Sequence, residues 1–123
     1  MTSALSRYKQ NLETYFLIWL DATVNTSEEN IQAQQQLRTS INHLTTFDND
    51  SECEEYIRSI SKDDRIILIV SGQLGQEFLP RIHQLQQVFS IYVYCNDKTK
   101  HEQWAQDFIK VSHIIKQVKE KYF

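Results

Sequence analysis

The chain has 123 residues, a net charge of −3, 41% hydrophobic residues and 24% charged residues, a composition typical of one globular domain with a full core. The slight acidity argues against general nucleic-acid binding, and no apolar run approaches the roughly 18–20 residues that span a bilayer. The start of the chain lacks the apolar core of a signal peptide, and Cys53 and Cys95 have no CxxC spacing, so we expect a reducing, cytoplasmic setting without a membrane.

The first buried-strand pattern is the apolar run at residues 15–20, which ends at Asp21. A short run that is apolar at nearly every position is typical of a strand covered on both faces of a parallel sheet. Residues 1–14 before it form a leader or a short helix, because their few apolar positions have helical spacing. After it, Thr26 stands three residues before Glu29, a capping-box spacing that predicts the start of a helix covering one face of the sheet.

The central pattern of the chain is the run at residues 66–70, which is followed by Ser71-Gly72. A second capping box at residues 51–54 predicts the helix that precedes this strand. After the strand, Pro80 suits only the first turn of a helix, so we expect that helix to start near residues 78–79.

Five strands and four connecting helices therefore follow one another along the chain. The predicted strands are residues 15–21, 44–47, 65–72, 89–95 and 111–115, and the last connecting helix is residues 99–109. Each separation between strands leaves room for one right-handed crossover helix. We predict a three-layer α/β domain over residues 15–115, with a five-stranded parallel sheet in the flavodoxin-like order 2-1-3-4-5. Residues 116–123 form a further helix or a connector.

In this order the two most apolar strands lie side by side at the centre of the sheet. We expect four of their side chains, Leu17, Trp19, Ile67 and Ile69, to be buried in adjacent parallel strands.

Polar residues follow several predicted strands, and the carboxyl ends of parallel strands share one edge of the sheet. The candidate ligand-binding residues at this edge are Asp21, Asp48, Ser71, Gly72, Gly75 and Asn96. Asp21 and Asp48 either converge on a cation, since hard ions favour carboxylate oxygens, or each cap a loop or helix. The Ser71–Gly75 loop either brings backbone N–H groups to an anion or is a turn that requires glycine.

No catalytic constellation is complete in this sequence. Ser71 does not lie in a GxSxG motif, and Cys95 ends a strand, where it could be exposed, without an activating base nearby. The four histidines, His43, His83, His101 and His113, lie in separate segments without metal-ligand spacing. Cys53 and the two tryptophans are predicted to pack in the core. We therefore predict no catalytic residue, no metal centre and no cofactor, and we favour a domain that is not an enzyme on its own.

Charge is distributed unevenly along the chain. Residues 48–64 are rich in acids, and residues 98–121 are rich in lysine. This pattern is either an ordinary solvated surface or a pair of opposed patches that steer a protein partner, an adjoining domain or a second copy. The second interpretation predicts weak, salt-sensitive self-association.

The succession of strands resembles two known domain classes. The acid that ends the first strand resembles response-regulator receivers, although Ser71 stands where receivers carry the acceptor aspartate. Residues 68–71 followed by Leu74 resemble the third strand and following loop of TIR domains. The TIR resemblance implies, as an alternative function, an enzyme related to NAD or another nucleotide that uses the carboxyl edge of the sheet.

Three further stretches, at residues 16–21, 69–75 and 91–95, resemble an uncharacterised animal domain found at the N-terminus of longer proteins. That domain precedes ADP-ribosyltransferase or tetratricopeptide regions. The resemblance implies an accessory module of a larger protein. The main functional hypothesis is therefore a non-catalytic, receiver-like or TIR-like interaction or regulatory module.

Overall fold

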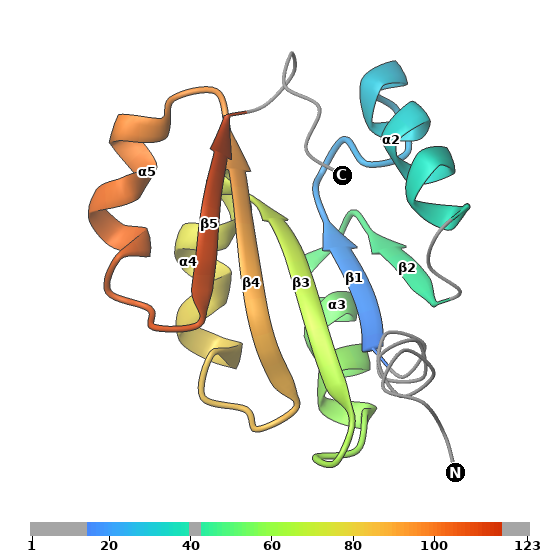
Figure 1. Cartoon of the computed structure of the whole chain (residues 1–123), viewed down its shortest axis with the longest axis vertical. Coiled ribbons are helices and arrows are strands. Elements are labelled where there is room, and N and C mark those ends of the chain that lie inside the picture. The colour runs from blue at the N-terminus through green and yellow to red at the C-terminus, as the bar shows by residue number, and fades with distance from the viewer. Residues whose placement is uncertain (1–14, 40–42, 117–123) are drawn as a thin grey trace, which may run out of the picture.

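The computed structural model describes residues 15–39 and 43–116, in which strands and helices alternate (Figure 1). The elements, in chain order, are β1 (Tyr15–Leu20), α2 (Glu28–Arg38), β2 (Leu44–Phe47), α3 (Asp50–Ser59), β3 (Arg65–Ser71), α4 (Gly72–Ile82), β4 (Val88–Cys95), α5 (Lys98–Ala105) and β5 (Val111–Lys116). The predictions for residues 1–14 and 117–123 fall outside the described residues. No helix in the described ranges is both long enough and apolar enough to cross a membrane.

The five strands form one parallel sheet in the order β2-β1-β3-β4-β5, which confirms the predicted flavodoxin-like architecture. The two most apolar strands pair at its centre, with Phe16 opposite Ile66 and Leu20 opposite Val70. Because successive side chains of a strand point to opposite faces, β1 and β3 contribute to two separate cores.

The first core lies between the sheet and helices α3, α4 and α5; in Figure 1, α3 and α4 run behind the sheet. Its buried side chains are almost all aliphatic: Ile18, Leu20, Cys53, Ile57, Ile66, Leu68, Val70, Phe78, Leu79, Ile82, Val88, Ile91 and Val93. Burial of each large apolar side chain contributes roughly 1.5–3 kcal/mol. We call this side of the sheet the aliphatic face.

The second core lies on the opposite side, where α2 is the covering helix among the described residues. It is smaller and contains more polar groups: Leu17, Trp19, Val24, Leu37, Leu44, Ile69 and Tyr94 are buried there, close to buried Asp21, Asn30 and Gln34. We call this side the mixed face. Leu17, Trp19 and Ile69 are buried as predicted, whereas Ile67 is only partly buried and packs at the margin of this core.

The prediction that α4 starts near residues 78–79 is wrong. The helix begins at Gly72, and Ser71 caps it by accepting a hydrogen bond from the Leu74 N–H at 3.4 Å. Pro80 lies inside the helix, two residues before its end. Its ring removes the N–H that would bond the Gln76 carbonyl, and since both residues are exposed, water can replace that donor.

The other helix boundaries differ from the sequence predictions by small amounts. Ser27, one residue after the predicted cap, caps α2, and Asn49 rather than Ser51 caps α3. Asp97 caps α5, which is shorter than the predicted helix over residues 99–109. Each of these side chains accepts a hydrogen bond from the backbone N–H three residues later, the usual role of an N-cap.

Candidate functional site

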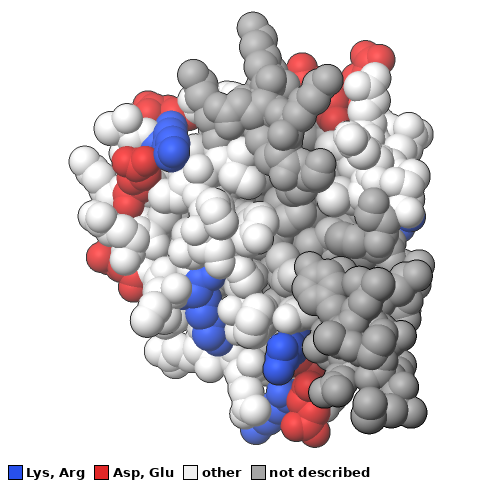
Figure 2. All heavy atoms as spheres, in the orientation of Figure 1, with Lys and Arg blue, Asp and Glu red and all other residues white. Residues whose placement is uncertain are grey.

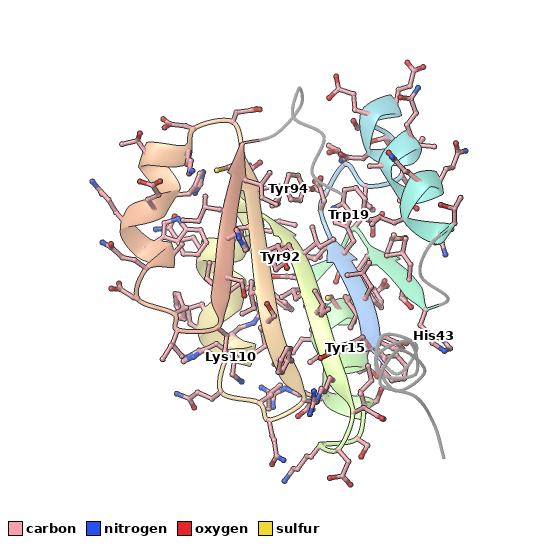
Figure 3. All side chains as sticks on the ribbon, in the orientation of Figure 1. Tyr15, Trp19, His43, Tyr92, Tyr94 and Lys110 are labelled. Carbon is pink, nitrogen blue, oxygen red and sulfur yellow. The ribbon has the colours of Figure 1, made fainter. Side chains whose placement is uncertain are left out.

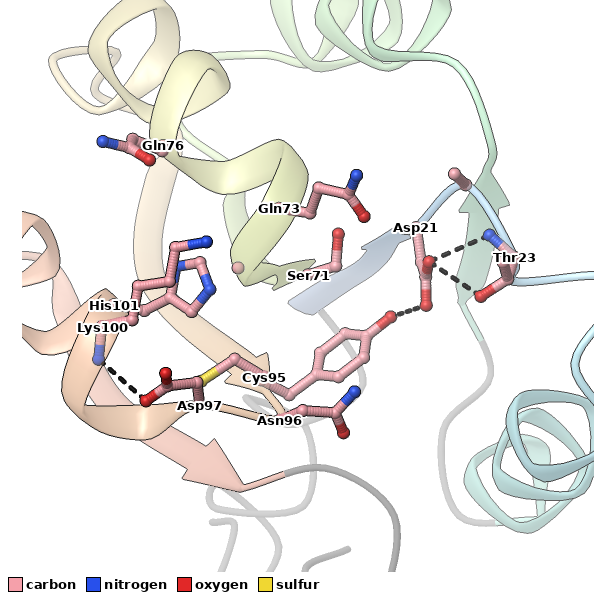
Figure 4. A pocket seen from close by; sticks show the side chains of 13 residues that line it. Asp21, Thr23, Ser71, Gln73, Gln76, Cys95, Asn96, Asp97, Lys100 and His101 are labelled. Atoms are coloured by element: carbon pink, nitrogen blue, oxygen red, sulfur yellow. Dashed lines mark hydrogen bonds between the residues drawn. The ribbon is translucent and has the colours of Figure 1, made fainter.

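A cavity of about 500 Å³ opens at the carboxyl edge of the sheet (Figure 4). It lies over the ends of β1, β3 and β4 and beside the first turns of α4 and α5. Its walls are the residues Asp21, Ala22, Thr23, Ser71, Gly72, Gln73, Gln76, Tyr94, Cys95, Asn96, Asp97, Lys100 and His101. We call it the carboxyl-edge cavity.

The structure brings four of the six predicted site residues together at this cavity. Asp21, Ser71, Gly72 and Asn96 all line it, whereas Asp48 and Gly75 do not. Asp48 is exposed and follows β2.

Gly75 has a packing role instead. It is buried within α4, where an added Cβ atom would lie 3.1 Å from the Trp104 ring and 3.3 Å from a Val70 methyl group. The second glycine of the predicted loop therefore allows α4 to approach β3 and α5 closely.

The Asp21 carboxylate is held in a buried network of hydrogen bonds. Oδ1 accepts from the Thr23 backbone N–H at 2.9 Å and from the Thr23 hydroxyl at 3.1 Å. Oδ2 accepts from Asn30 Nδ2 at 2.7 Å and from the Tyr94 hydroxyl. A carboxylate accepts about four hydrogen bonds, so the protein itself satisfies Asp21.

The same network continues to a second aromatic side chain. Trp19 Nε1 donates to the Tyr94 hydroxyl at 3.0 Å, and the two rings meet edge to face with centroids 5.9 Å apart. Figure 3 shows both side chains on the mixed face. Asp21 therefore holds α2 and β4 to the end of β1, and its oxygens are not left to share a cation with Asp48.

Gly72 marks a close approach between α4 and α5. An added Cβ atom would stand 2.8–2.9 Å from three atoms of the His101 ring, so the ring would have to shift to admit even a methyl group. The backbone at Gly72 does not adopt the left-handed conformation. The glycine is therefore needed for contact rather than for a turn with positive φ.

His101 lines the cavity in a defined tautomer. Its Nδ1 accepts a hydrogen bond from Trp104 Nε1 at 3.0 Å, so the proton of the neutral ring lies on Nε2. Burial, and then the nearby Lys100 cation, lowers the pKa of His101 below its ordinary value of 6.5. The ring is therefore a neutral N–H donor at pH 7.

The two cysteines are buried thiols. The sequence left Cys95 as a residue that could be exposed, but the structure buries it. Burial, followed by the nearby Asp97 charge, raises the pKa of its thiol. Cys53 packs in the aliphatic core as predicted, where burial raises its pKa to about 12. Neither residue has thiolate character at neutral pH.

Part of the predicted acidic region is neutralised within the molecule. Arg81 pairs with Asp50 at 3.3 Å and with Glu54 at 3.0 Å, and Arg58 also pairs with Glu54 at 2.9 Å. On the face drawn in Figure 2, charges of both signs are scattered among other residues. Two lysines of the predicted basic region, Lys119 and Lys121, lie outside the described residues.

Several residues at the cavity were not singled out from the sequence. Gln73, Gln76, Lys100 and His101 come from the first two turns of α4 and α5, and Tyr94 comes from the end of β4. His101 and Trp104 are three residues apart, a spacing that puts both on one side of a helix and could have indicated their contact.

No group of three or more His, Cys, Asp or Glu side chains among the described residues has the arrangement of a metal site. No protein-family model, no curated protein and no solved structure matches the chain. The fold and the carboxyl-edge cavity are therefore the basis for any statement about function.

Proposed function

We propose that this domain is a non-catalytic regulatory module that binds a small oxygen-rich ligand, such as a nucleotide, in the carboxyl-edge cavity. The observation that carries the proposal is the cavity itself, which has a volume of about 500 Å³ between the first turns of α4 and α5. Ligand sites of α/β sheets lie at the carboxyl ends of the strands, and typical volumes are about 300–1,000 Å³.

The chemistry of the walls supports a ligand with many acceptor oxygens. Gln73, Gln76 and Asn96 contribute amide groups, Lys100 an ammonium group and His101 an N–H donor. Of the two carboxylates of the wall, Asp21 is satisfied within its network, whereas Asp97 accepts the Lys100 backbone N–H at 3.1 Å and keeps further acceptor positions. The wall therefore offers donors for carbonyl and phosphate oxygens and acceptors for hydroxyl groups of the ligand.

The local roles of the reactive side chains support binding without chemistry. The Ser71 hydroxyl caps α4, and the Cys95 thiol is buried with a raised pKa. The Nδ1 atom of His101 is occupied by Trp104, and its Nε2 carries a proton. Each side chain that could act as a nucleophile or a base thus already has a structural partner or the wrong protonation state.

Calorimetry and thermal unfolding with ATP, NAD and ADP-ribose, each with and without Mg²⁺, test this proposal. At a ligand concentration one hundred times the dissociation constant, mass action adds about 2.7 kcal/mol to the free energy of unfolding. We expect at least one of these ligands to stabilise the protein without being consumed. Absence of binding by the whole panel would contradict the proposal, and turnover of NAD would favour the enzymatic alternative.

A matched pair of variants locates the site. Gln73→Glu puts a carboxylate on the wall of the cavity, in the first turn of α4, where an acid does not destabilise the helix. We expect this variant to lose ligand binding and keep its melting temperature. Gln84→Glu makes the same change at an exposed position outside the cavity, and we expect it to bind as the parent does.

A protein partner or an adjoining domain is a second proposal, supported by the exposed acids of α3. Asp50 and Glu54 are paired with arginines, which leaves Glu52 and Glu55 exposed without an ion pair in the described part of the chain. Reversal of Glu52 and Glu55 to lysine should weaken capture of an adjoining domain and leave stability unchanged. Undiminished capture would contradict a role for this surface.

The resemblance to N-terminal modules of longer animal proteins agrees with a regulatory role. Cys53 and Cys95 are both free thiols, which supports the proposal of a reducing, cytoplasmic setting.

A further inference from the structure

β5 is the last strand at one edge of the sheet. Among the described residues this strand pairs only with β4, so one row of its backbone N–H and C=O groups has no strand beside it (Figure 1). The pairing of β4 with β5 shifts register between Ile91 and Tyr92, so Ser112 is an extra residue of β5 that is opposite no residue of β4. From His113 to Lys116 the pairing is regular. An open edge of this kind can add another strand.

A groove of about 480 Å³ runs between this strand and α5. Phe108, Val111 and Ile114 contribute apolar side chains to it, and Ile109 on its rim is 97% exposed. A groove between an edge strand and a helix offers backbone pairing on one side and apolar contact on the other. The surface therefore has the two features that a docked strand uses.

The charges of the groove indicate which partner fits. Lys98 and Glu102 both line it and lie one helical turn apart on α5. Both are exposed, and neither forms an ion pair in the described ranges. A patch that carries one charge of each sign is complementary to its own copy when the two are related by a twofold axis.

We propose that a second copy of this chain docks at this groove, with the two β5 edges paired antiparallel into one continuous sheet. The twofold axis places Lys98 opposite Glu102 of the partner subunit, and it removes Ile109 from water on both copies. This interface lies on a different edge from the carboxyl-edge cavity and does not depend on ligand binding.

Sedimentation velocity of the 123-residue chain, measured over a wide range of protein concentrations, tests the interface. We expect a dimer that forms with increasing concentration and weakens between about 0.1 M and about 1 M salt, as the Debye length falls from about 10 Å to about 3 Å. Ile109→Asp should abolish it with an unchanged melting temperature, because the side chain is almost fully exposed in the monomer. A monomer at all concentrations and both salt levels would overturn the proposal.

Charge reversal tests the twofold arrangement directly. Lys98→Glu and Glu102→Lys should each weaken association several-fold, whereas the double variant, or a mixture of the two single variants, should restore it. Glu77→Lys, at an exposed position of α4 outside the groove, is the matched control and should associate as the parent does. Failure of the double variant to restore association would overturn the assigned pairing.

Hydrogen exchange at the amides of β5 distinguishes a second copy from another segment of the same chain as the occupant of this edge. Protection of His113–Lys116 that increases with protein concentration is expected for the dimer. Protection that is complete in a strict monomer would place another segment of the same chain on this edge and overturn the proposal.

Discussion

The two faces of the sheet are stabilised in different ways. The aliphatic face carries three helices over side chains that are almost all apolar and pack mainly through nondirectional contacts, with Gln87 Nε2 also donating to the Ile57 carbonyl at 3.1 Å. On the mixed face, α2 is attached in large part by polar groups: Asn30 donates to Asp21 at 2.7 Å, Gln34 to the Val24 carbonyl at 2.6 Å, and Arg38 to the Leu44 carbonyl at 3.0 Å.

This difference means that a small displacement of a helix changes the free energy in a different way on each face of the sheet. Apolar burial is nondirectional, so small shifts change its energy gradually. A buried hydrogen-bond network is either satisfied or not, and a broken one leaves groups without partners. Since Asp21 and Tyr94 also line the carboxyl-edge cavity, the polar attachment of α2 is directly connected to the candidate site.

The largest expected effect is on the aliphatic face. Leu68→Ala removes a fully buried side chain of β3 and should lower the free energy of unfolding by roughly 2–5 kcal/mol. Ile67→Ala, its neighbour on the mixed face, removes a partly buried side chain and should lower it far less. Urea unfolding measures both. Equal losses, or a loss below about 0.5 kcal/mol at Leu68, would contradict the assigned faces.

A smaller effect is expected from the hydrogen-bond network of the mixed face. Tyr94→Phe removes the hydroxyl that joins Trp19 Nε1 to Asp21, and it should lower stability by about 1–3 kcal/mol. Hydrogen exchange should show the largest loss of protection in α2. Tyr92→Phe, two residues earlier on the same face of β4, is the control; if it has the same effect, the network does not hold the helix.

The pH dependence of stability that arises from His101 reports on the cavity rather than on either core. Because burial lowers the pKa of His101, the folded protein binds a proton at lower pH than the unfolded chain does. Its contribution to stability is complete above the ordinary pKa of 6.5 and is lost as the pH falls through the lower value of the folded state. Protonation also puts a proton on Nδ1, so the Trp104 hydrogen bond must break. The indole N–H resonance of Trp104 should shift on acidification, while that of Trp19 should not follow the same titration.

The smallest expected effect is a difference between two glycines of α4. Gly72→Ala puts a methyl group within 2.9 Å of the His101 ring and should displace α5, whereas Gly75→Ala meets Trp104 at 3.1 Å and needs less adjustment. Melting temperatures and the Trp104 indole resonance report both changes. A more damaging substitution at Gly75 would show that the helix core, rather than the edge of the cavity, sets the tighter contact.

The sheet could be predicted from the sequence because each strand is a short apolar run and each gap holds one crossover helix. Asp21, Ser71, Gly72 and Asn96 could be placed at one edge for the same reason, since strand ends in a parallel sheet meet there. The predicted position of these four residues depends only on where each strand ends.

The helical part of the cavity could not be predicted in this way. Pro80 moved the expected start of α4 toward the middle of the real helix, which left Gln73 and Gln76 in a supposed loop. Lys100 and His101 face the cavity only because of the rotation of α5 about its axis, which depends on the contacts of His101 with Gly72 and of Trp104 with Gly75 on α4. The Tyr94–Asp21 bond crosses β3 and requires the full register of three strands.

The network around Asp21 also limits which substitutions the chain can accept one at a time during evolution. A change at Thr23, Asn30 or Tyr94 alone would remove one hydrogen bond from a buried carboxylate, so intermediate sequences would be less stable than either endpoint. The effects of such substitutions should be strongly non-additive, and descendants should keep or lose these residues as a group. On the aliphatic face, in contrast, one side chain can be exchanged for another of similar volume independently of its neighbours.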